Sequence, residues 1–381
     1  MVTGRTIDSF DLRLPRQTVF GRGEIRRLGG VAAGFGKRAL LVTGNRFLAE
    51  SGALARIQED LKAHDVSWVQ LSASGEPDVE AVDGAARKGI DERCDMVIAV
   101  GGGSVLDLGK AAAGMIPNAG SITEYLEGAG KAAVMKNDPV PFIAAPTTAG
   151  TGSEATRNAV IKGPGCKKSF RDPRLVPPAA IVDPDLTATC PPDRTASAGM
   201  DAVTQLVESL TSIKAHPVTD MLALSGLDAA GWALPSAVEN GGDAGARAAM
   251  AYASFLSGLA LSHAGLGAVH GLASPLGGLF SIPHSAACAR LLPLVTRANL
   301  AALNSGRGFA PALDAYRRAD KALGCDITRY CARFRFPGLA SFGMKESDIP
   351  TVVGAATSGS MKTNPVELTP GELAGILKEA M

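Results

Sequence analysis

The spacing of hydrophobic and polar positions changes near residue 190 of this 381-residue chain. Before that point, short apolar runs rich in β-branched residues alternate with segments long enough to form helices, as in a parallel sheet covered by helices on both faces. The strands predicted from these runs are residues 39–43, 66–71, 96–100, 141–145 and 179–183. Beyond it, Ala, Leu and Gly recur at helical spacing with almost no strand signal. The helices predicted there are residues 198–210, 217–230, 246–261 and 285–303.

A boundary between two domains is predicted within residues 183–193, because the prolines of this segment disfavour the continuation of either a strand or a helix. A chain of this length also exceeds what one hydrophobic core ordinarily organises. We therefore expect an α/β domain over residues 1–185 and an all-α domain over residues 186–381.

The net charge of the chain bears on which kinds of partner it can bind. The 38 basic and 37 acidic side chains leave a net charge of +1, which gives no bulk electrostatic reason to bind nucleic acid or an acidic membrane. We expect a small-molecule partner.

Apolar runs are interrupted by charges or glycines before they reach the length of a bilayer span, and no secretion signal is recognised at the start, so a cytoplasmic location is expected. The six cysteines form no CxxC pair and are interpreted as reduced thiols in a core.

A phosphate-binding corner is predicted where the strand 96–100 runs into the segment GGGSVLDLGK. Glycines let backbone N–H groups approach a ligand, and the helix expected from about Ser104 turns its positive end toward a diphosphate. The cofactor contacts predicted here are Gly101, Gly102, Gly103, Ser104 and Asp107, with Gly102 expected at positive φ. A tight turn without a ligand would give a similar pattern, so the corner gains weight only from the segments that follow.

Two further segments are interpreted as cofactor contacts. The loop PTTAGTGSE follows the strand 141–145 and carries Thr147, Thr148 and Thr151 at the carboxyl end of the sheet, where open α/β sheets bind ligands. The first strand ends in Gly44, Asn45 and Arg46, without the carboxylate that binds the ribose of NAD and repels the 2′-phosphate of NADP. NADP is therefore compatible with this end of the site as well as NAD, because Arg46 could pair with the 2′-phosphate. The alternative is that Arg46 is only a solvated charge.

A metal site is predicted in the second half of the chain. Asp201 and Gln205 are one helical turn apart, and His270 and His284 come from two later elements. One carboxylate, one amide oxygen and two imidazoles form a four-coordinate set for a divalent ion. Three of the five histidines, including His263, lie within 22 residues of each other. The other two, His64 and His216, are interpreted as surface residues.

Taken in order, these segments resemble the iron-containing, group III alcohol dehydrogenase family, which shares the dehydroquinate synthase-like fold. The segments GGGSVLDLGK, PTTAGTGSE, LVPPAAIVDPDLT, GMDAVTQLVE, AGLGAVHGLASPLGG and IPHSAACARLLP carry the resemblance along nearly the whole chain. It implies a Rossmann-like dinucleotide-binding domain, a helical metal- and substrate-binding domain, and NAD(P) with Fe²⁺ or Zn²⁺ held between them. It also implies that Lys168 contacts the cofactor and that the protein forms a homo-oligomer.

The chain departs from the family pattern at three positions. Gln205 replaces the first of three metal-binding histidines, Ser274 replaces a histidine implied in proton relay, and Gly44 replaces the usual aspartate. We therefore expect a weakened metal site and a proton path through Ser274, His263, the ribose hydroxyl or water. The reaction implied is reversible hydride transfer between a nicotinamide and a small alcohol or its aldehyde or ketone, with the substrate oxygen at the metal beside His270 and His284.

Two alternatives stay open at this level. A maleylacetate-reductase-like enzyme would reduce a carbon–carbon double bond without a metal, and the missing histidine at position 205 favours it. A cofactor-binding protein with a decayed active site is a second alternative, against which Asp201, His270 and His284 all persist. The sequence does not indicate which alcohol or aldehyde is the substrate.

Overall fold

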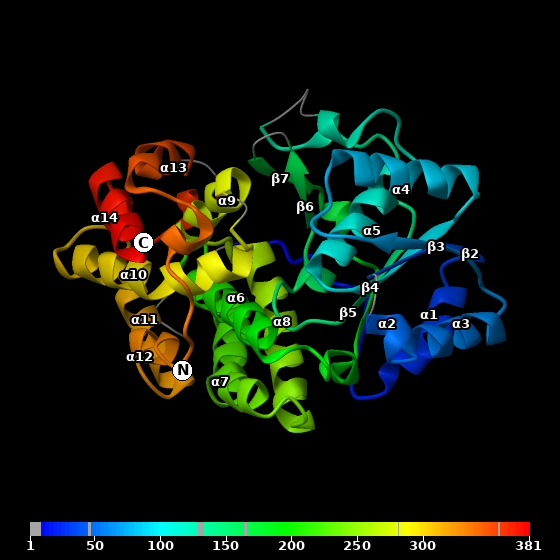
Figure 1. Ribbon diagram of the computed structural model, residues 1–381, viewed down its shortest axis with the longest axis horizontal. Coiled ribbons are helices and arrows are strands. Elements are labelled where there is room, and N and C mark those ends of the chain that lie inside the picture. Colours follow the sequence, from blue (N-terminus) through cyan, green and yellow to red (C-terminus); the bar gives the residue numbers. More distant parts are fainter. Residues whose placement is uncertain (1–8, 45–46, 129–132, 164–165, 281, 357–358) are drawn as a thin grey trace. The chain divides into compact units, whose positions relative to one another are not determined.

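The computed structural model describes residues 9–44, 47–128, 133–163, 166–280, 282–356 and 359–381 (Figure 1). These residues fold as two compact units. Residues 13–148 and 152–189 form the first, which we call the α/β unit. Residues 149–151 and 190–381, together with the N-terminal segment before residue 13, form the second, which we call the helical unit.

The α/β unit is built on a six-stranded sheet in the order β1-β8-β5-β4-β2-β3, in which all paired strands are parallel. Its strands are β1 (Gln17–Phe20), β2 (Arg38–Gly44), β3 (Ser67–Ala73), β4 (Met96–Gly101), β5 (Phe142–Pro146) and β8 (Ala179–Val182). The five strands predicted from sequence are all present, which confirms the predicted fold class. The edge strand β1 was missed because only Val19 of its four residues is buried, so it carries no apolar run.

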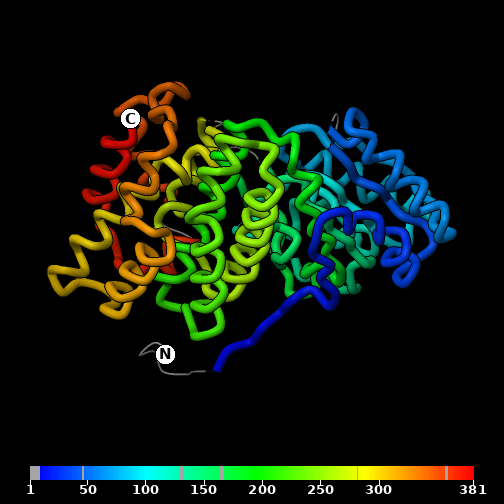
Figure 2. Tube along the Cα trace, turned by 90° about the horizontal axis from the view of Figure 1, so that it is seen from below, coloured from blue at the N-terminus to red at the C-terminus, as the bar shows by residue number. Residues whose placement is uncertain are grey.

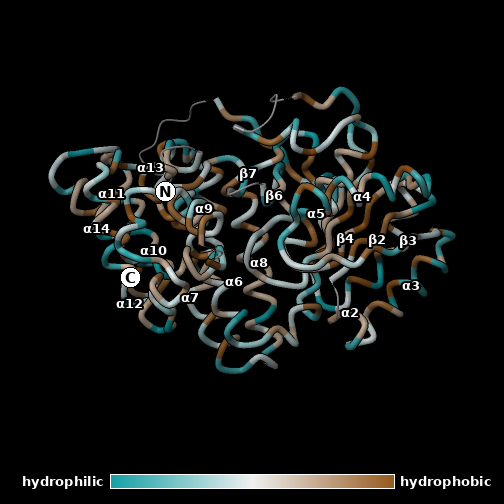
Figure 3. The backbone as a smooth tube through the Cα atoms, turned by 45° about the horizontal axis from the view of Figure 1, so that its top comes forward, coloured by the Kyte–Doolittle hydropathy of each residue, from teal (hydrophilic) through white to brown (hydrophobic). Residues whose placement is uncertain are grey.

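Both faces of this sheet are buried, which explains the nearly continuous apolar runs of β2 and β4 (Figure 3). Alternate residues such as Leu40 and Val97 pack in one core, which also contains Val82 of α4 (Val79–Asp91) and Leu106 of α5 (Gly103–Met115). Their neighbours along the strands pack in a second core with side chains of α1 (Leu28–Ala33) and α3 (Ala53–Ala63). A short helix, α2 (Phe47–Glu50), follows β2.

A two-stranded antiparallel hairpin, β6 (Asn158–Gly163) and β7 (Cys166–Arg171), lies outside the main sheet and was not predicted. In β6, Ala159 and Ile161 are buried while Val160 and Lys162 are exposed. This alternation is typical of a strand with one solvated face, but it extends over too few residues to stand out from a loop in the sequence.

The helical unit begins with three helices that lie side by side, α6 (Pro192–Thr211), α7 (Pro217–Glu239) and α8 (Ala244–Ala264) (Figure 2). The next two are α9 (Ala268–Phe280) and α10 (His284–Asn304). The remaining helices are α11 (Pro311–Leu323), α12 (Ile327–Cys331), α13 (Ile349–Ala355) and α14 (Pro370–Ala380). The glycine-rich segment AGLGAVHGLASPLGG, for which no helix was predicted, contains most of α9, whose Gly271 leaves room for the side chain of Met361.

Two helices of this unit, α7 and α10, are long and apolar enough to cross a membrane by length and composition. The sequence-based statement that the apolar stretches end too early is therefore wrong for these two. Their hydropathy is partly accounted for by burial, because 44% and 61% of the apolar windows lie inside the protein. Ala223, Leu227 and Leu234 of α7, for example, are fully buried in the helical core.

Candidate metal and cofactor sites

Three helices of the helical unit bring four potential metal ligands together. Asp201 lies on α6, His270 on α9, and His284 and Cys288 are the first and fifth residues of α10. One ligand atom from each of these residues lies within 4.8 Å of all the others. The structure thus gathers three of the four predicted ligands, Asp201, His270 and His284, and adds a cysteine that the sequence analysis had assigned to the core.

Among four distances between these atoms, three match those around a tetrahedral ion, and the fourth, between Asp201 and His284, is longer. Zinc bonds of about 2.3 Å to sulfur and about 2.0–2.1 Å to nitrogen or oxygen place sulfur and nitrogen about 3.6 Å apart, and oxygen and nitrogen about 3.3 Å apart. Cys288 Sγ lies 3.7 Å from Nε2 of both His270 and His284. Asp201 Oδ1 lies 3.4 Å from His270 Nε2 and 3.9 Å from His284 Nε2. The four atoms are therefore spaced to share one cation.

Asp201 supports this interpretation independently. Its residue is only 2% exposed, yet Oδ1 accepts no well-formed hydrogen bond from any residue that the structure describes. A buried carboxylate oxygen without a donor is costly, and a bound cation is the usual compensation. Burial raises the pKa of Asp201, but the neighbouring imidazoles of His270 and His284 outweigh it, so the pKa is lowered. The residues present therefore fit a divalent ion.

Glu208 orients His270. It lies on α6, almost one helical turn after Gln205. Its Oε2 lies 2.6 Å from His270 Nδ1, and its Oε1 accepts a hydrogen bond of 2.6 Å from the backbone N–H of Val269. This pairing keeps a proton on Nδ1, so Nε2 is the nitrogen that would bind a metal in exchange for any proton it carries. Burial lowers the pKa of His270, but Cys288, Glu208 and Asp201 together raise it well above its usual value. The pKa of His284 is raised in the same way, against burial, by Cys288 and Asp201.

Gln205 has a different partner in the structure. It is buried, and its side-chain oxygen accepts a hydrogen bond of 2.6 Å from the hydroxyl of Ser257 on α8. The predicted role of Gln205 as a metal ligand stays a prediction. Ser274 is half-buried on α9, one turn after His270, and His263 Nδ1 lies 2.7 Å from the carbonyl oxygen of Leu259 within α8. Their predicted roles in proton transfer are likewise untested.

The predicted phosphate-binding corner is a strand-to-helix turn at the carboxyl end of β4. Gly102 is the N-cap of α5, with φ −70° and ψ 177°, so the expectation of a positive φ is wrong. The sterically restricted position is Gly101, where a Cβ atom would lie 2.5 Å from Cβ of Val105. A Cβ atom at Gly102 would lie 3.5 Å from the side chain of Thr148, an ordinary contact. Gly103 and Ser104 form the first turn of α5, whose N–H groups lack helical acceptors.

The threonine loop adjoins this corner. The backbone N–H of Thr147 donates a hydrogen bond of 3.0 Å to the carbonyl oxygen of Gly101, so the ends of β4 and β5 are tied together. Thr147 and Thr148 are half-buried, and Thr151 is exposed. Gly44 ends β2 and is half-buried, whereas Asn45 and Arg46 lie outside the described residues. Lys168 is half-buried in β7, paired in register with Ile161.

Asp107, predicted to contact the cofactor, is engaged within the protein. Its two carboxylate oxygens accept hydrogen bonds from the Ser153 hydroxyl, at 2.6 Å, and from the Val160 backbone N–H, at 3.1 Å. The carboxylate therefore joins α5 to the hairpin and to the end of the threonine loop. Sequence reasoning gave no sign of this structural role, because the two partners are 46 and 53 residues away along the chain.

Two buried ionisable groups lie beneath the same loop. Lys110 Nζ donates hydrogen bonds to Ser153, Thr156 and the carbonyl oxygen of Asn158, at 2.7 to 3.1 Å. Burial lowers the pKa of Lys110 to about 8, although Asp107 and Glu154 oppose the shift. Burial also raises the pKa of Glu154 to about 7, against a backbone hydrogen bond and the charge of Lys110. The hydrogen bonds of Lys110 hold the end of the threonine loop in place.

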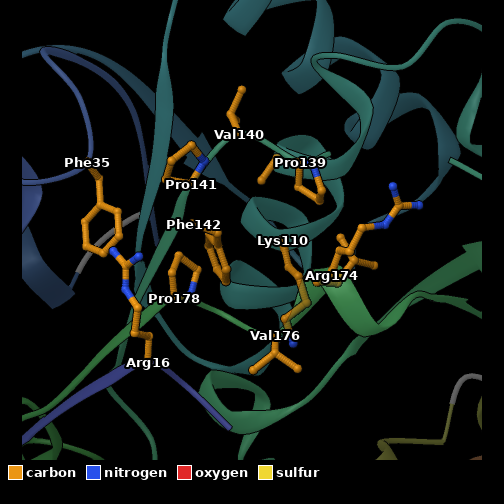
Figure 4. Close-up of a pocket in the computed structure, with 12 residues that line it drawn as sticks. Arg16, Phe35, Lys110, Pro139, Val140, Pro141, Phe142, Arg174, Val176 and Pro178 are labelled. Carbon is orange, nitrogen blue, oxygen red and sulfur yellow. The ribbon is translucent and has the colours of Figure 1, made fainter. Parts of the chain in front are cut away.

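A cavity of about 260 Å³ in the α/β unit is lined by Arg16, Phe142 and Pro178, among others (Figure 4). Phe142 begins β5 and pairs with Val97 near the start of β4, so the cavity lies at the amino ends of the strands. The glycine corner and the threonine loop are at the carboxyl ends, where ligands bind in open parallel sheets. The cavity is therefore separate from the predicted cofactor contacts.

The fold and the cluster together define a class of protein: an α/β unit with a glycine corner at the carboxyl end of its parallel sheet, and a helical unit with a buried metal-ligand cluster. A family profile described as "Iron-containing alcohol dehydrogenase" matches residues 15–184, and one described as "Fe-containing alcohol dehydrogenase family, C-terminal" matches residues 195–381. The chain belongs to the iron-containing alcohol dehydrogenase family. This confirms the resemblance and the predicted class of enzyme, an oxidoreductase.

Comparisons with individual proteins agree with this family assignment. The chain is 31% identical over 385 residues to the NAD-dependent methanol dehydrogenase of Bacillus methanolicus, covering 97% of this chain and 99% of the relative. It is 36% identical over 392 residues to the 1,3-propanediol dehydrogenase of Klebsiella pneumoniae, covering 97% and 98%. Among solved structures, a 1,3-propanediol oxidoreductase matches with a TM-score of 0.87 and 33% identity over 98% of this chain and 100% of that chain.

Cys288 and Glu208 are the site residues that sequence reasoning missed. Cys288 follows His284 by four residues and Glu208 follows Asp201 by seven, which in a helix places each pair on one face. That spacing was the available signal. It was not decisive, because a lone cysteine is most often a core residue and a glutamate is most often exposed.

Proposed function

We propose that the protein is an NAD(P)-dependent, metal-assisted dehydrogenase that interconverts a small alcohol and its aldehyde or ketone. The observation that carries the proposal is the convergence of Asp201, His270 and His284 at distances suited to one cation, with Asp201 Oδ1 lacking a donor among the described residues. Residues 1–185 would bind the dinucleotide, and residues 186–381 would bind the metal and the substrate.

Binding of the dinucleotide is assigned to the carboxyl end of the sheet. The N–H groups at the start of α5 would hold the diphosphate, with Gly101, Gly102, Gly103 and Ser104 providing close approach. The hydroxyls of Thr147, Thr148 and Thr151, and the ammonium of Lys168, would contact the ribose and nicotinamide end. Gly44 places no carboxylate at the end of β2, so the proposal includes both NAD and NADP.

Binding of the metal and the substrate is assigned to the cluster. Asp201, His270 and His284 would hold Fe²⁺ or Zn²⁺, and Glu208 would keep His270 in the tautomer that presents Nε2. When bound, the ion supplies Lewis-acid polarisation of the substrate oxygen, and the nicotinamide supplies or takes the hydride. The His284 side chain is 35% exposed, which gives a small substrate access to this side of the cluster. His263, Ser274 or water would carry the proton.

The test is a panel of short alcohols and aldehydes, including methanol, 1,3-propanediol and the corresponding aldehydes, assayed with NADH/NAD⁺ and NADPH/NADP⁺ after treatment with a chelator and re-addition of Fe²⁺ or Zn²⁺. The proposal predicts turnover that depends on added metal. Reduction of maleylacetate by metal-free protein would instead support the metal-independent reductase. The absence of turnover with every substrate, despite dinucleotide binding, would support a decayed cofactor-binding protein.

We also propose that the protein acts as a homo-oligomer in the cytoplasm, with no nucleic-acid or membrane partner. The balanced charge of the chain supports the absence of a nucleic-acid partner. Light scattering coupled to size-exclusion chromatography measures the oligomeric state directly, and a mass equal to one chain would contradict the proposal.

A further inference from the structure

Cys288 occupies the position within the cluster that a fourth ligand requires. It is fully buried, and its Sγ lies at the same distance, 3.7 Å, from Nε2 of His270 and of His284. If both Nε2 atoms are unprotonated, as binding to a metal requires, a thiol with one proton to donate cannot satisfy both of them as a hydrogen-bond donor. Two imidazole nitrogens and an orphaned carboxylate oxygen facing one sulfur are the surroundings of a metal-bound thiolate.

Gln205, in contrast, has its oxygen engaged with Ser257. An amide oxygen is also a weaker ligand than a thiolate for a borderline ion such as Zn²⁺. On α6, Gln205 stands at a position that the family resemblance assigns to a metal ligand. Cys288 can take its place from α10, because it follows His284 by one helical turn and can face the same point.

We infer that Cys288 is the fourth protein ligand of the metal and that the set Asp201, His270, His284 and Cys288 selects Zn²⁺ over Fe²⁺. The inference rests on the proposed metal-assisted function but concerns only the ligand set. On binding, the thiol loses its proton to solvent and its sulfur forms the bond to the ion. Thiolate ligands favour zinc, whereas carboxylate and water ligands suit harder ions.

Cobalt is the probe for this inference, because Co²⁺ bound by a thiolate absorbs in the near ultraviolet through sulfur-to-metal charge transfer. The chelator-treated full chain is titrated with CoCl₂ as wild type, as Cys288→Ser and as Cys331→Ser. Cys331 is a matched control, since it is also a buried free cysteine of the helical unit. The rate at which Zn²⁺ is lost to a chelator is measured for the same three proteins, and circular dichroism checks that each is folded.

The expected result is a charge-transfer band in wild type and Cys331→Ser that is absent in Cys288→Ser. Zinc should also leave Cys288→Ser at least about tenfold faster, since even indirect changes at metal sites weaken binding about 10- to 100-fold. If folded Cys288→Ser keeps the band and the zinc, the thiolate ligand is wrong, while the metal site and the proposed function stand. If wild type binds neither Co²⁺ nor Zn²⁺, the inference fails together with the metal-assisted part of the proposed function.

A third variant guards against a Cys288→Ser protein that does not fold. Cys288→Ala in the presence of saturating Co²⁺ should fold and bind cobalt through three protein ligands, without the charge-transfer band. A wild-type spectrum in folded Cys288→Ala would overturn the inference as decisively.

Discussion

The carboxylate of Glu208 controls which nitrogen of His270 can bind a metal, because one of its oxygens accepts a hydrogen bond from Nδ1–H and the other accepts one from the backbone N–H of Val269. In Glu208→Gln the amide has one acceptor oxygen and an NH₂ group. If the oxygen keeps Val269, the NH₂ faces Nδ1 and the proton moves to Nε2, which then cannot bind the ion.

We therefore expect Glu208→Gln to weaken zinc binding by about 10- to 100-fold, the usual effect of removing a carboxylate that orients a metal-binding histidine. Competition with a metallochromic chelator measures the affinity. Unchanged affinity in folded Glu208→Gln would show that His270 does not bind the metal through Nε2.

The two glycines at the end of β4 should respond differently to substitution. A Cβ atom at Gly101 would lie 2.5 Å from Val105, so Gly101→Ala should cost about 1–3 kcal/mol of unfolding free energy through overpacking. Gly102 has an extended backbone, and a Cβ atom there would make only an ordinary contact with Thr148, so Gly102→Val should fold normally. Its side chain would nevertheless occupy the space in which a diphosphate approaches the N-terminus of α5.

Gly102→Val should accordingly lose nucleotide affinity without losing thermal stability. Isothermal titration with NADH, alongside thermal unfolding of both variants, separates the two effects. Wild-type affinity for NADH in Gly102→Val would show that the diphosphate binds elsewhere.

Gly44 is expected to set the choice between NAD and NADP. A Cβ atom there would lie 3.9 Å from Val105, so an aspartate fits without strain. Two charges about 4 Å apart near a protein surface interact by roughly 4 kcal/mol before screening by salt. Gly44→Asp should therefore lower kcat/KM with NADPH relative to NADH by at least about tenfold. A ratio that does not fall would place the 2′ position of the ribose away from residue 44.

The sequence predicted the metal ligands whose residue types are common in metal sites. Asp201, His270 and His284 were predicted as ligands, and the structure brings all three together. Cys288 and Glu208 were not predicted, because their significance depends on how α6, α9 and α10 pack rather than on residue type. Gly102 was assigned a positive φ because it lies in a glycine-rich turn, but its φ is −70°, and the glycine that lack of space requires is its neighbour Gly101.

At the scale of elements, the threonine loop depends on an ionisable pair that no strand or helix pattern would reveal. Glu154 lies in the short 3₁₀ helix Ser153–Ala155 and is 1% exposed, and burial raises its pKa to about 7. The folded protein therefore holds a proton on Glu154 between about pH 4.5 and 7 that the unfolded chain releases. The resulting stabilisation is fully present below about pH 4.5 and is lost as the pH rises to 7.

Wild type should lose up to roughly 3 kcal/mol of unfolding free energy relative to Glu154→Gln over this interval, since a tenfold difference in proton affinity between the folded and unfolded states corresponds to about 1.4 kcal/mol. Urea unfolding of both proteins at about pH 4 and about pH 7.5, on either side of this change, gives the difference. A wild type that gains stability relative to Glu154→Gln as the pH rises would mean that Glu154 is ionised and paired with Lys110 throughout.

Elements with strong periodicity were predicted well, and marginal ones were not. The buried strands β2 and β4 have nearly continuous apolar runs, so their positions in the sequence were clear. The edge strand β1 and the hairpin β6–β7 each bury only alternate or single residues, which a loop could match. The helix α9 was not predicted, because glycines are poor helix formers; in the structure, Gly271 allows close packing against Met361.

At the scale of the whole molecule, the order of the motifs predicted more than any single motif. The glycine corner alone was compatible with an ordinary turn, and each histidine alone with a core residue. Their succession along nearly the whole chain indicated the family, which both family profiles confirm. The substrate could not be predicted, because the walls of a substrate site depend on side chains from several helices whose orientation follows from packing.

Alcohol oxidation is proposed to depend on a metal held by the cluster in the helical unit. The most direct test measures metal content and NAD⁺-linked alcohol oxidation on the same samples of wild type and His270→Ala, after dialysis against a chelator and after re-addition of Zn²⁺. The account predicts that wild type regains about one equivalent of metal, as expected for one tetrahedral site, together with its activity. His270→Ala should regain neither. A wild type that is fully active without metal, and a His270→Ala protein with the same rate, would contradict the account.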